Sequence, residues 1–220
     1  MLLALVNIST FLTLVFSLSL GFYTLYRNPK SLVHRLWFLT NMAVAVWTFG
    51  YLLITYFTYK GGLFHFKLLY TGVIFIPILS FHFVLEFLYK AKKYKNLIIV
   101  GYVIGVVLLA LFYFTDWLIV GTQYTDHLIW NELPGKLFFI FLLYFHFFAF
   151  YSIYLLFDSF RKNEGLIKVQ SLYILVAFLF GFLGGIFNFI MDLTGIFPLG
   201  QMFVFLYPVI ITYTIFLKKY

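Results

Sequence analysis

The sequence predicts an all-α membrane protein, a bundle of seven transmembrane helices. Apolar residues make up 64% of the 220 residues and charged residues only 10%, whereas soluble domains carry about 25% charged residues. The apolar residues gather in blocks of about 20, the length that an α-helix needs to cross a bilayer. This composition excludes soluble enzymes, nucleic-acid-binding modules and disordered tails. The absence of cysteine excludes disulfides and cysteine-ligated metals.

Each apolar block is long enough to span the hydrocarbon as a helix. The first block has no preceding basic segment and no small-residue cleavage site, so we expect it to remain as a helix and not to be removed as a signal peptide. No second domain and no three-plus-three repeat is visible, which predicts one domain over residues 1–220 and lowers the case for a transporter. The predicted spans are Leu2–Tyr26, Leu36–Phe57, Leu68–Tyr89, Leu97–Thr115, Leu137–Leu156, Ser171–Met191 and Leu199–Leu217. Each has a charged residue close to one end, in the same order Arg27, Arg35, Lys90, Lys95, Lys136, Asp192 and Lys218.

The distribution of basic residues predicts the orientation. Cytoplasmic loops of membrane proteins hold the excess of Lys and Arg. Twelve of the 15 basic residues lie in the connections between spans 1 and 2, 3 and 4, and 5 and 6, or in the C-terminal tail. We therefore expect the N-terminus outside and the C-terminus inside, with contacts to membrane lipids and none to nucleic acid. These basic residues are Arg27, Lys30, Arg35, Lys90, Lys92, Lys93, Lys95, Arg161, Lys162, Lys168, Lys218 and Lys219.

The connection 116–136 is the one long loop. Its tryptophan, tyrosine and acidic residues are typical of an aromatic belt, and we expect a small extracellular cap here.

Polar side chains inside the membrane are the main functional candidates, because each costs free energy unless it is paired or faces a cavity. His82 and Glu86 are four residues apart and share a helix face, which allows an imidazole–carboxylate hydrogen bond. The alternative is that Glu86 pairs with Lys90 near the headgroups, while His82 bonds a neighbouring helix. The first arrangement makes His82 and Glu86 candidate ligand-binding residues, whereas the second gives them a structural role only.

A second polar group lies near the outer membrane face. Asn188 and Asp192 share a face of the sixth span, and Gln201 begins the seventh. With Asn7 and Thr10 of the first span, they predict the mouth of an aromatic-lined pocket for a small ligand. Plain turn formation around Asp192 is the alternative.

Two aromatic residues near mid-membrane, His146 and Trp47, are further ligand-binding candidates. Each is also a common packing residue that bonds a neighbouring helix. Haem ligation by His82 and His146 is disfavoured, because their depths differ by roughly 7–8 Å at 1.5 Å per residue. We predict no metal and no cofactor, and no catalytic motif is present.

Proline and glycine residues mark kinks and close helix contacts. Pro77 and Pro208 fall within predicted spans, where a missing backbone hydrogen bond makes them candidate hinges. The pairs Gly101 with Gly105 and Gly181 with Gly185 (the latter on the sixth span) predict close helix approach, within a subunit or across a dimer.

Four segments resemble the N-terminal seven-transmembrane sensor region of bacterial and archaeal histidine kinases. They are NPKSLVHRLWFLTNMAVAVWTFGYLL (Asn28–Leu53), FIPILSFHFVLEFL (Phe75–Leu88), LPGKLFFIFLLYF (Leu133–Phe145) and GFLGGIFNFIMDLTGIFPLGQMFVFLYPVIITYTI (Gly181–Ile215). They follow one another in the family's order and cover nearly the whole chain. Ile186 and Asp192 depart from the family pattern, which often has Pro or Thr near its Asn-Phe element.

The resemblance implies a sensory module in the prokaryotic cell membrane. It implies a homodimer and a cytoplasmic kinase output, with the last helix passing on a signal from an unknown small or lipophilic ligand. No phosphoacceptor helix or ATP lid is present, so we expect no enzyme activity in these residues. A small transporter or channel that uses His82, Glu86 and Asp192 as a relay is the alternative.

Overall fold

The computed structural model describes the chain except residues 1, 57–62, 125–129, 195–201 and 217–220, and except the side chains of residues 2, 124, 130–131, 183 and 185–194. Seven helices and two strands lie in the described part. They are α1 (Leu2–Arg27), α2 (Leu32–Tyr56), α3 (Leu63–Phe87), α4 (Lys95–Phe114), β1 (Ile119–Tyr124), β2 (Trp130–Pro134), α5 (Phe138–Lys162), α6 (Gly165–Thr194) and α7 (Leu206–Phe216). Six helices, α1 to α6, are long and apolar enough to cross a membrane, and α7 is a shorter apolar helix of 11 residues.

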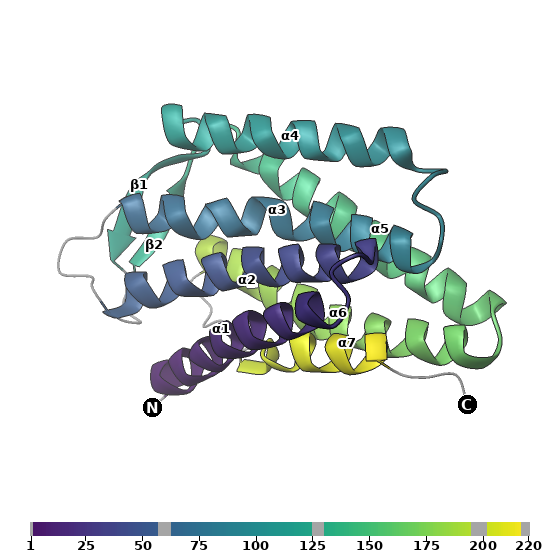
Figure 1. Ribbon diagram of the computed structural model, residues 1–220. Coiled ribbons are helices and arrows are strands. Elements are labelled where there is room, and N and C mark those ends of the chain that lie inside the picture. The colour runs from purple at the N-terminus through teal and green to yellow at the C-terminus, as the bar shows by residue number, and fades with distance from the viewer. Residues whose placement is uncertain (1, 57–62, 125–129, 195–201, 217–220) are drawn as a thin grey trace.

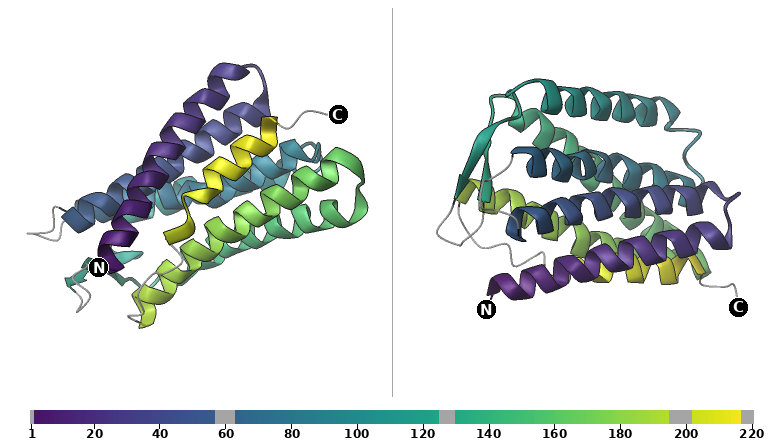
Figure 2. Two further views of the ribbon diagram at one scale, coloured as in Figure 1. Left: turned by 90° about the horizontal axis from the view of Figure 1, so that it is seen from below. Right: turned by 60° about the vertical axis from the view of Figure 1, so that its left-hand side comes forward.

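The helices run alternately in opposite directions (Figure 1). The connections α1–α2, α3–α4 and α5–α6 gather at one end of the bundle, where the last turn of α7 also lies, and the start of α1 lies with β1 and β2 at the other (Figures 1 and 2). We call these the basic end, after Arg27, Lys90, Lys93 and Arg161 of its connections and helix termini, and the hairpin end.

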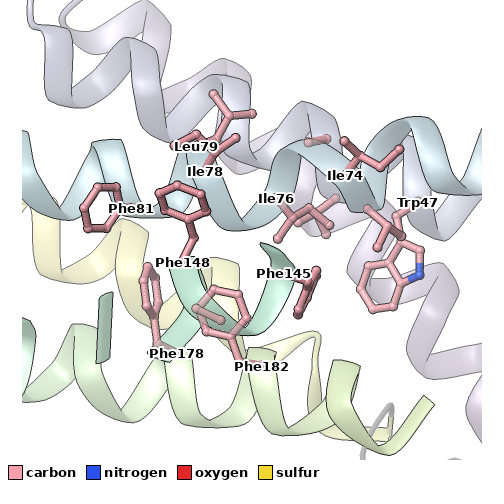
Figure 3. Packing of buried hydrophobic residues seen from close by; sticks show 14 of the residues in the cluster. Trp47, Ile74, Ile76, Ile78, Leu79, Phe81, Phe145, Phe148, Phe178 and Phe182 are labelled. Carbon is pink, nitrogen blue, oxygen red and sulfur yellow. The ribbon is translucent and has the colours of Figure 1, made fainter. Parts of the chain in front are cut away.

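Six of the helices form a ring, with α4 on its outside. Neighbours in the ring are α1, α2, α3, α5, α6 and α7, and α7 packs back against α1. Helix α4 packs against α3 and leaves an apolar face outward. Aromatic and branched side chains fill the ring, among them Trp47, Ile74, Phe145 and Phe178 (Figure 3). An apolar outer face is expected where lipid replaces water as the solvent.

Glycine residues set the closest helix contacts. A Cβ at Gly72 of α3 would overlap the Ala43 carbonyl of α2 and lie 2.6 Å from the Trp47 nitrogen. Gly50 of α2 meets the Leu69 backbone of α3 in the same way. These contacts bring α2 and α3 together at backbone distance, as small residues do in membranes.

Gly101, Gly105 and Gly181 of the predicted pairs pack within the subunit, and the surroundings of Gly185 are not among those described. The Gly101 position faces Ile78 and Phe148, and Gly105 faces the Tyr144 hydroxyl. Both therefore allow α4 to approach α3 and α5. Gly181 of α6 lies against the Tyr207 ring of α7.

Helix α1 has its polar side toward the protein and its apolar side outward. Asn7, Thr10, Thr13 and Ser17 are buried against the bundle. The outward side chains are Leu5, Ile8, Phe11, Val15, Leu18 and Phe22. Several inward hydroxyls bond carbonyls one turn back in α1, such as Thr13 to Ser9 at 2.8 Å, so a polar face is compatible with lipid.

The long loop forms a β-hairpin, which the sequence analysis did not predict. Strands β1 and β2 pair antiparallel, with Thr122 opposite Glu132 and a bulge between Ile119 and Gly121. The Gly135 nitrogen donates to the Leu118 carbonyl at 2.8 Å, which ties the hairpin base to the start of α5. The expected cap is therefore a folded unit.

The observed helices match the predicted spans closely at six positions and differ at the seventh. Residues 202–205 form a 3₁₀ turn and a bend, and the α-helix begins only at Leu206. The mid-helix placement of Pro208 is therefore wrong, since this residue lies in the first turn of α7. There a missing N–H costs little, because the first N–H groups of a helix have no helical partner.

Candidate sensing site

Glu132 joins the hairpin to the helices. Its carboxylate accepts a hydrogen bond from the Tyr70 hydroxyl of α3, and both side chains are buried. The Tyr70 ring stacks on Phe112 of α4 at 4.8 Å and meets Phe141 of α5 edge-on at 5.4 Å. One acidic residue of the cap is thus connected to three helices at the hairpin end.

The Trp37 indole of α2 is the centre of a polar cluster inside the ring. Its Nε1 donates to the Thr212 hydroxyl of α7 at 3.0 Å. The Trp37 ring packs at 5.2 Å on Tyr207 of α7 and at 5.4 Å on Phe83 of α3. One turn along α2, the Asn41 amide nitrogen donates to the Trp37 carbonyl at 2.8 Å. The cluster brings α2, α3 and α7 together within the membrane.

Side-chain hydrogen bonds hold α7 and its approach at three levels. Near the hairpin end, the Ser9 hydroxyl of α1 donates to the Met202 carbonyl at 2.9 Å. Thr212 accepts from Trp37 further along. Toward the basic end, the Gln170 amide of α6 donates to the Thr214 carbonyl at 2.9 Å. A displacement of α7 would therefore change bonds to three other helices.

His82 bonds a neighbouring helix. Its Nδ1 lies 3.1 Å from the Tyr102 hydroxyl of α4. The Nε2 atom is 3.9 Å from Glu86 Oε1, which is too long for a hydrogen bond. The alternative in which His82 bonds a neighbouring helix is confirmed.

The other half of that alternative, a pairing of Glu86 with Lys90, is replaced by a pairing of Lys90 with Asp158 of α5, at 3.7 Å. Helix α3 ends at Phe87, and Tyr89 has a positive φ of 57°. The Lys90 nitrogen then donates to the Leu85 carbonyl at 2.7 Å and the Tyr89 nitrogen to that of Glu86 at 3.1 Å, the Schellman pattern that ends a helix. Lys90 therefore does not lie on the same helical face as Glu86.

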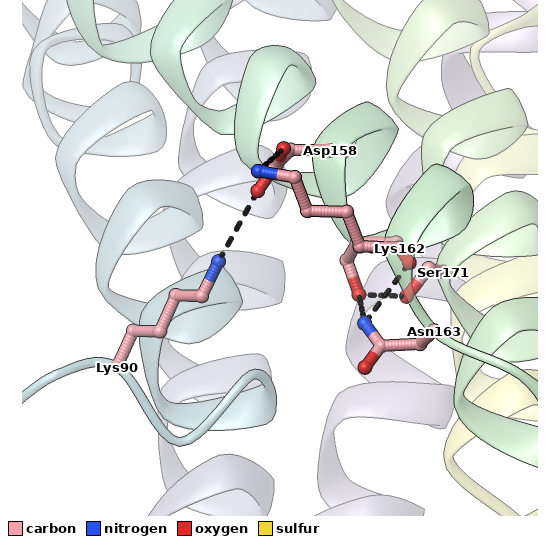
Figure 4. A network of polar contacts seen from close by, with 6 residues as sticks. Lys90, Asp158, Lys162, Asn163 and Ser171 are labelled. Carbon is pink, nitrogen blue, oxygen red and sulfur yellow. Dashed lines mark hydrogen bonds and ion pairs between the residues drawn. The ribbon is translucent and has the colours of Figure 1, made fainter.

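A second polar network ties α5 to α6 at the basic end (Figure 4). Asp158 pairs with Lys162 at 2.7 Å as well as with Lys90. The Ser159 and Ser171 hydroxyls lie 2.9 Å apart, and the Asn163 amide donates to the Ser159 carbonyl at 2.9 Å. This network fixes the turn between α5 and α6.

His146 and Trp47 take packing positions. The His146 Nδ1 donates to the Leu142 carbonyl of its own helix at 2.7 Å, and its ring contacts Phe150. Trp47 is buried in the core near Gly72 (Figure 3).

The outer candidates lie mostly outside the described residues. Asn188 and Asp192 fall within α6, but their side chains are not described, and neither is Gln201. Asn7 and Thr10 are buried on the inward face of α1. Pro77 lies inside α3 as expected. Among the described residues, no group of three His, Asp or Glu side chains could hold a metal ion.

The sequence analysis did not single out several residues of these clusters. Glu132 was only one of the acidic residues of a predicted cap, and Tyr70, Trp37, Asn41 and Tyr207 looked like ordinary residues of apolar spans. One signal was available: Glu132 is an acidic residue followed directly by Leu and Pro at a membrane boundary. The others are recognisable only once the helices are placed.

The fold and the polar interior define a multi-pass helical membrane protein with buried hydrogen bonds between its helices. A family model described as the N-terminal 7TM region of histidine kinase matches residues 9–218. The chain therefore belongs to this family, and the resemblance noted in the sequence is confirmed. This region is the sensory part of such kinases, not their catalytic part, and implies a kinase output domain on the cytoplasmic side. No curated protein and no solved structure gives a match.

Proposed function

We propose that residues 1–220 form one sensory domain of a histidine kinase, in which a ligand or bilayer property biases two packings of the bundle and α7 passes the difference to the kinase. The observation that carries the proposal is the set of side-chain bonds on α7 and its approach, from Ser9, Trp37 and Gln170. In this proposal the N-terminus is outside, the basic end faces the cytoplasm and the protein is a homodimer.

The free energies of hydrogen bonds between membrane helices are consistent with a switch of this kind. Hydrogen bonds between membrane helices contribute about 0.6 kcal/mol on average and at most about 1.7 kcal/mol. Three of them amount to roughly 2 kcal/mol, whereas a shift from 1:99 to 99:1 needs about 5.5 kcal/mol. The bonds on α7 therefore tune the equilibrium, and differential ligand affinity supplies the rest.

The site that receives the signal belongs to the same proposal. The candidates are an outer mouth with Asn188, Asp192 and Gln201, and the buried cluster around Trp37. The transporter alternative needs a relay that includes His82 and Glu86, whose closest atoms are 3.9 Å apart. Helix α3, which carries both, is continuous from Leu63 to Phe87. A discontinuous helix at this depth would have favoured transport.

The test is a fusion of this chain to a reporter kinase domain after Tyr220. Thr212→Val and Trp37→Phe each remove the bond between α2 and α7, and we expect both to shift basal kinase activity in the same direction, by about 3- to 20-fold if each bond contributes 0.6–1.7 kcal/mol. The double variant should shift activity no further than the single ones, because both remove the same bond.

The matched control is Thr48→Val. The Thr48 hydroxyl is equally buried on α2 but bonds the Val44 carbonyl of its own helix at 2.9 Å. This variant should leave kinase activity unchanged. If Thr212→Val and Trp37→Phe also leave it unchanged in membranes where the fusion is correctly inserted, α7 is not the output element and the proposal is wrong.

A further inference from the structure

Three buried polar atoms near Trp37 have no hydrogen-bond partner among the described residues. They are Asn41 Oδ1, the Ser80 hydroxyl and the Tyr207 hydroxyl. The exposed fractions of these residues are 0%, 0% and 5%. Unsatisfied buried polar atoms are rare in native proteins and call for an explanation. In a bilayer the cost is larger still, because no bulk water reaches the helices.

The three atoms belong to one neighbourhood. Tyr207 packs on the Trp37 ring, and Asn41 bonds the Trp37 carbonyl. Ser80 of α3 interacts with the Tyr207 hydroxyl without a hydrogen bond of normal geometry. Helices α2 and α7 thus each contribute one unsatisfied atom from a residue that contacts Trp37, and α3 contributes a third beside Tyr207. The Asn41 side chain also faces Gly21 of α1.

The chemistry of these atoms selects the ligand. An amide oxygen accepts a hydrogen bond, and each hydroxyl both donates and accepts. The stretch of α2 from Leu36 to Tyr56 and the whole of α7 contain no Asp, Glu, Lys or Arg, so no opposite charge is available for an ionic ligand. The only titratable side chain near Ser80 on α3 is His82, which bonds Tyr102 of α4. An ion would therefore bury an uncompensated charge.

The side chains around these atoms are apolar and aromatic. Phe83 of α3 contacts Trp37, and Phe178 of α6 lies 6.0 Å from the Tyr207 ring. An apolar lining with a few converging polar atoms is typical of a small-molecule site. Such a site fits a hydroxyl group attached to a hydrocarbon body.

We propose that the Trp37 cluster binds an uncharged, hydroxyl-bearing amphiphile, with its O–H donating to Asn41 and accepting from Tyr207 or Ser80. This names the ligand class of the sensory site and so rests on the proposed function. Because Thr212 and Tyr207 both belong to α7, an occupant of this site acts directly on the helix that carries the output.

The test is photolabelling of the purified chain in lipid nanodiscs with a diazirine derivative of 1-dodecanol, followed by peptide mapping. We expect labelling of peptides from α2 and α7 that is competed by 1-dodecanol and not by dodecane. Asn41→Leu and Tyr207→Phe should each reduce this labelling about fivefold, the ratio that the loss of one net hydrogen bond produces.

Tyr144→Phe is the matched control. The Tyr144 hydroxyl is also buried and without a hydrogen-bond partner in the described structure, but it lies at Gly105 between α4 and α5. Its removal should leave labelling of α2 and α7 unchanged. Tyr207→Phe removes a single oxygen, so it tests the site even if Asn41→Leu does not fold.

Equal competition by dodecane and dodecanol would overturn the proposal, since the unsatisfied atoms would then be hydrated by water alone. Labelling confined to outward side chains such as Val103 of α4 would overturn it as well. Neither result depends on a kinase. Binding without any effect of Thr212→Val on the fused kinase would refute the proposed function and leave the site standing.

Discussion

At the scale of single residues, Glu132 is a buried acidic group of the hairpin that is bonded to the helices. A buried carboxylate is costly unless it is hydrogen-bonded, and Tyr70 supplies such a bond from α3. The pair therefore makes the hairpin part of the bundle and not a loose loop. A ligand or proton that reached Glu132 from the hairpin end would act on α3, α4 and α5 together through the contacts of Tyr70.

Replacement of Glu132 by Leu should destabilise the protein by about 1–3 kcal/mol, because it removes the acceptor of a buried hydroxyl. Glu132→Gln keeps an acceptor and should cost less. The measurement is thermal unfolding in detergent, with Tyr70→Phe completing a double-mutant cycle. The control is Glu164→Gln, since Glu164 is exposed. A coupling energy of zero between Tyr70 and Glu132 would contradict the bond.

The sequence predicted which residues are polar and buried better than it predicted their partners. His82 was expected on an inward face with Glu86, and the spacing was right. Lys90 was assigned to the same face, but α3 ends before it, and the reversal at Tyr89 sends Lys90 to Asp158. The residue in the left-handed conformation at this helix end is a tyrosine and not the usual glycine, so the sequence carries no signal for the helix end. Partners such as Trp37 and Thr212 are far apart in sequence, so they can be recognised only once the helices are placed in the bundle.

At the scale of elements, the closest contact is the crossing of α2 and α3. Gly72→Ala would place a methyl group on the Ala43 carbonyl and the Trp47 nitrogen, which are backbone atoms that cannot rotate away. We expect destabilisation of at least about 1–3 kcal/mol, the usual cost of overpacking. The measurement is the unfolding midpoint in detergent. Gly121→Ala is the control, because its nearest neighbour would be 3.7 Å away, and an equal loss in both variants would argue against the crossing.

Helix α7 leads to a different prediction for Pro208 than its sequence position did. Because Pro208 lies in the first turn, Pro208→Ala removes no kink, and we expect the geometry of α7 to stay the same. Spin labels on cysteines introduced at the exposed residues Phe203 and Tyr213 measure this by their separation, and the chain has no other cysteine. A changed separation in the Pro208→Ala protein would support a hinge role for Pro208. Pro77, inside α3, then remains the proposed bending point.

At the scale of the whole molecule, hydropathy and spacing predicted the helical bundle and six spans within a few residues of α1 to α6. They did not predict the hairpin, because three of the five residues of β2 are types that strands rarely use, Asn131, Glu132 and Pro134. Nor did they predict the short α7, since residues 202–205, which precede it, are all apolar. The hairpin depends on the pairing of β1 with β2, and the start of α7 depends on packing against the bundle. Neither kind of contact is local in sequence.

The charge asymmetry gives a topology prediction. The basic residues gather at the end opposite the hairpin, so a reporter active only in the cytoplasm should give signal when fused after Tyr220. The same reporter inserted in the loop between β1 and β2 should be silent. A reporter active only outside should show the reverse pattern at both sites. Signal from the cytoplasmic reporter in the hairpin would invert the orientation.

The bond between Trp37 and Thr212 also bears on how the protein is made. Its partners are 175 residues apart, and at 5–20 residues per second the ribosome takes roughly 9–35 s to produce the second after the first. During this interval α1 and α2 are already synthesised while the acceptor for the indole N–H is not. Helix α1 can remain inserted in lipid during this interval, because the hydroxyls of residues such as Thr10 and Thr13 donate hydrogen bonds to carbonyls of their own helix. Completion of the ring therefore waits for α7, the last of the seven described helices to be synthesised. A nascent chain stalled before α7 would present the Trp37 side of α2 to the insertion machinery.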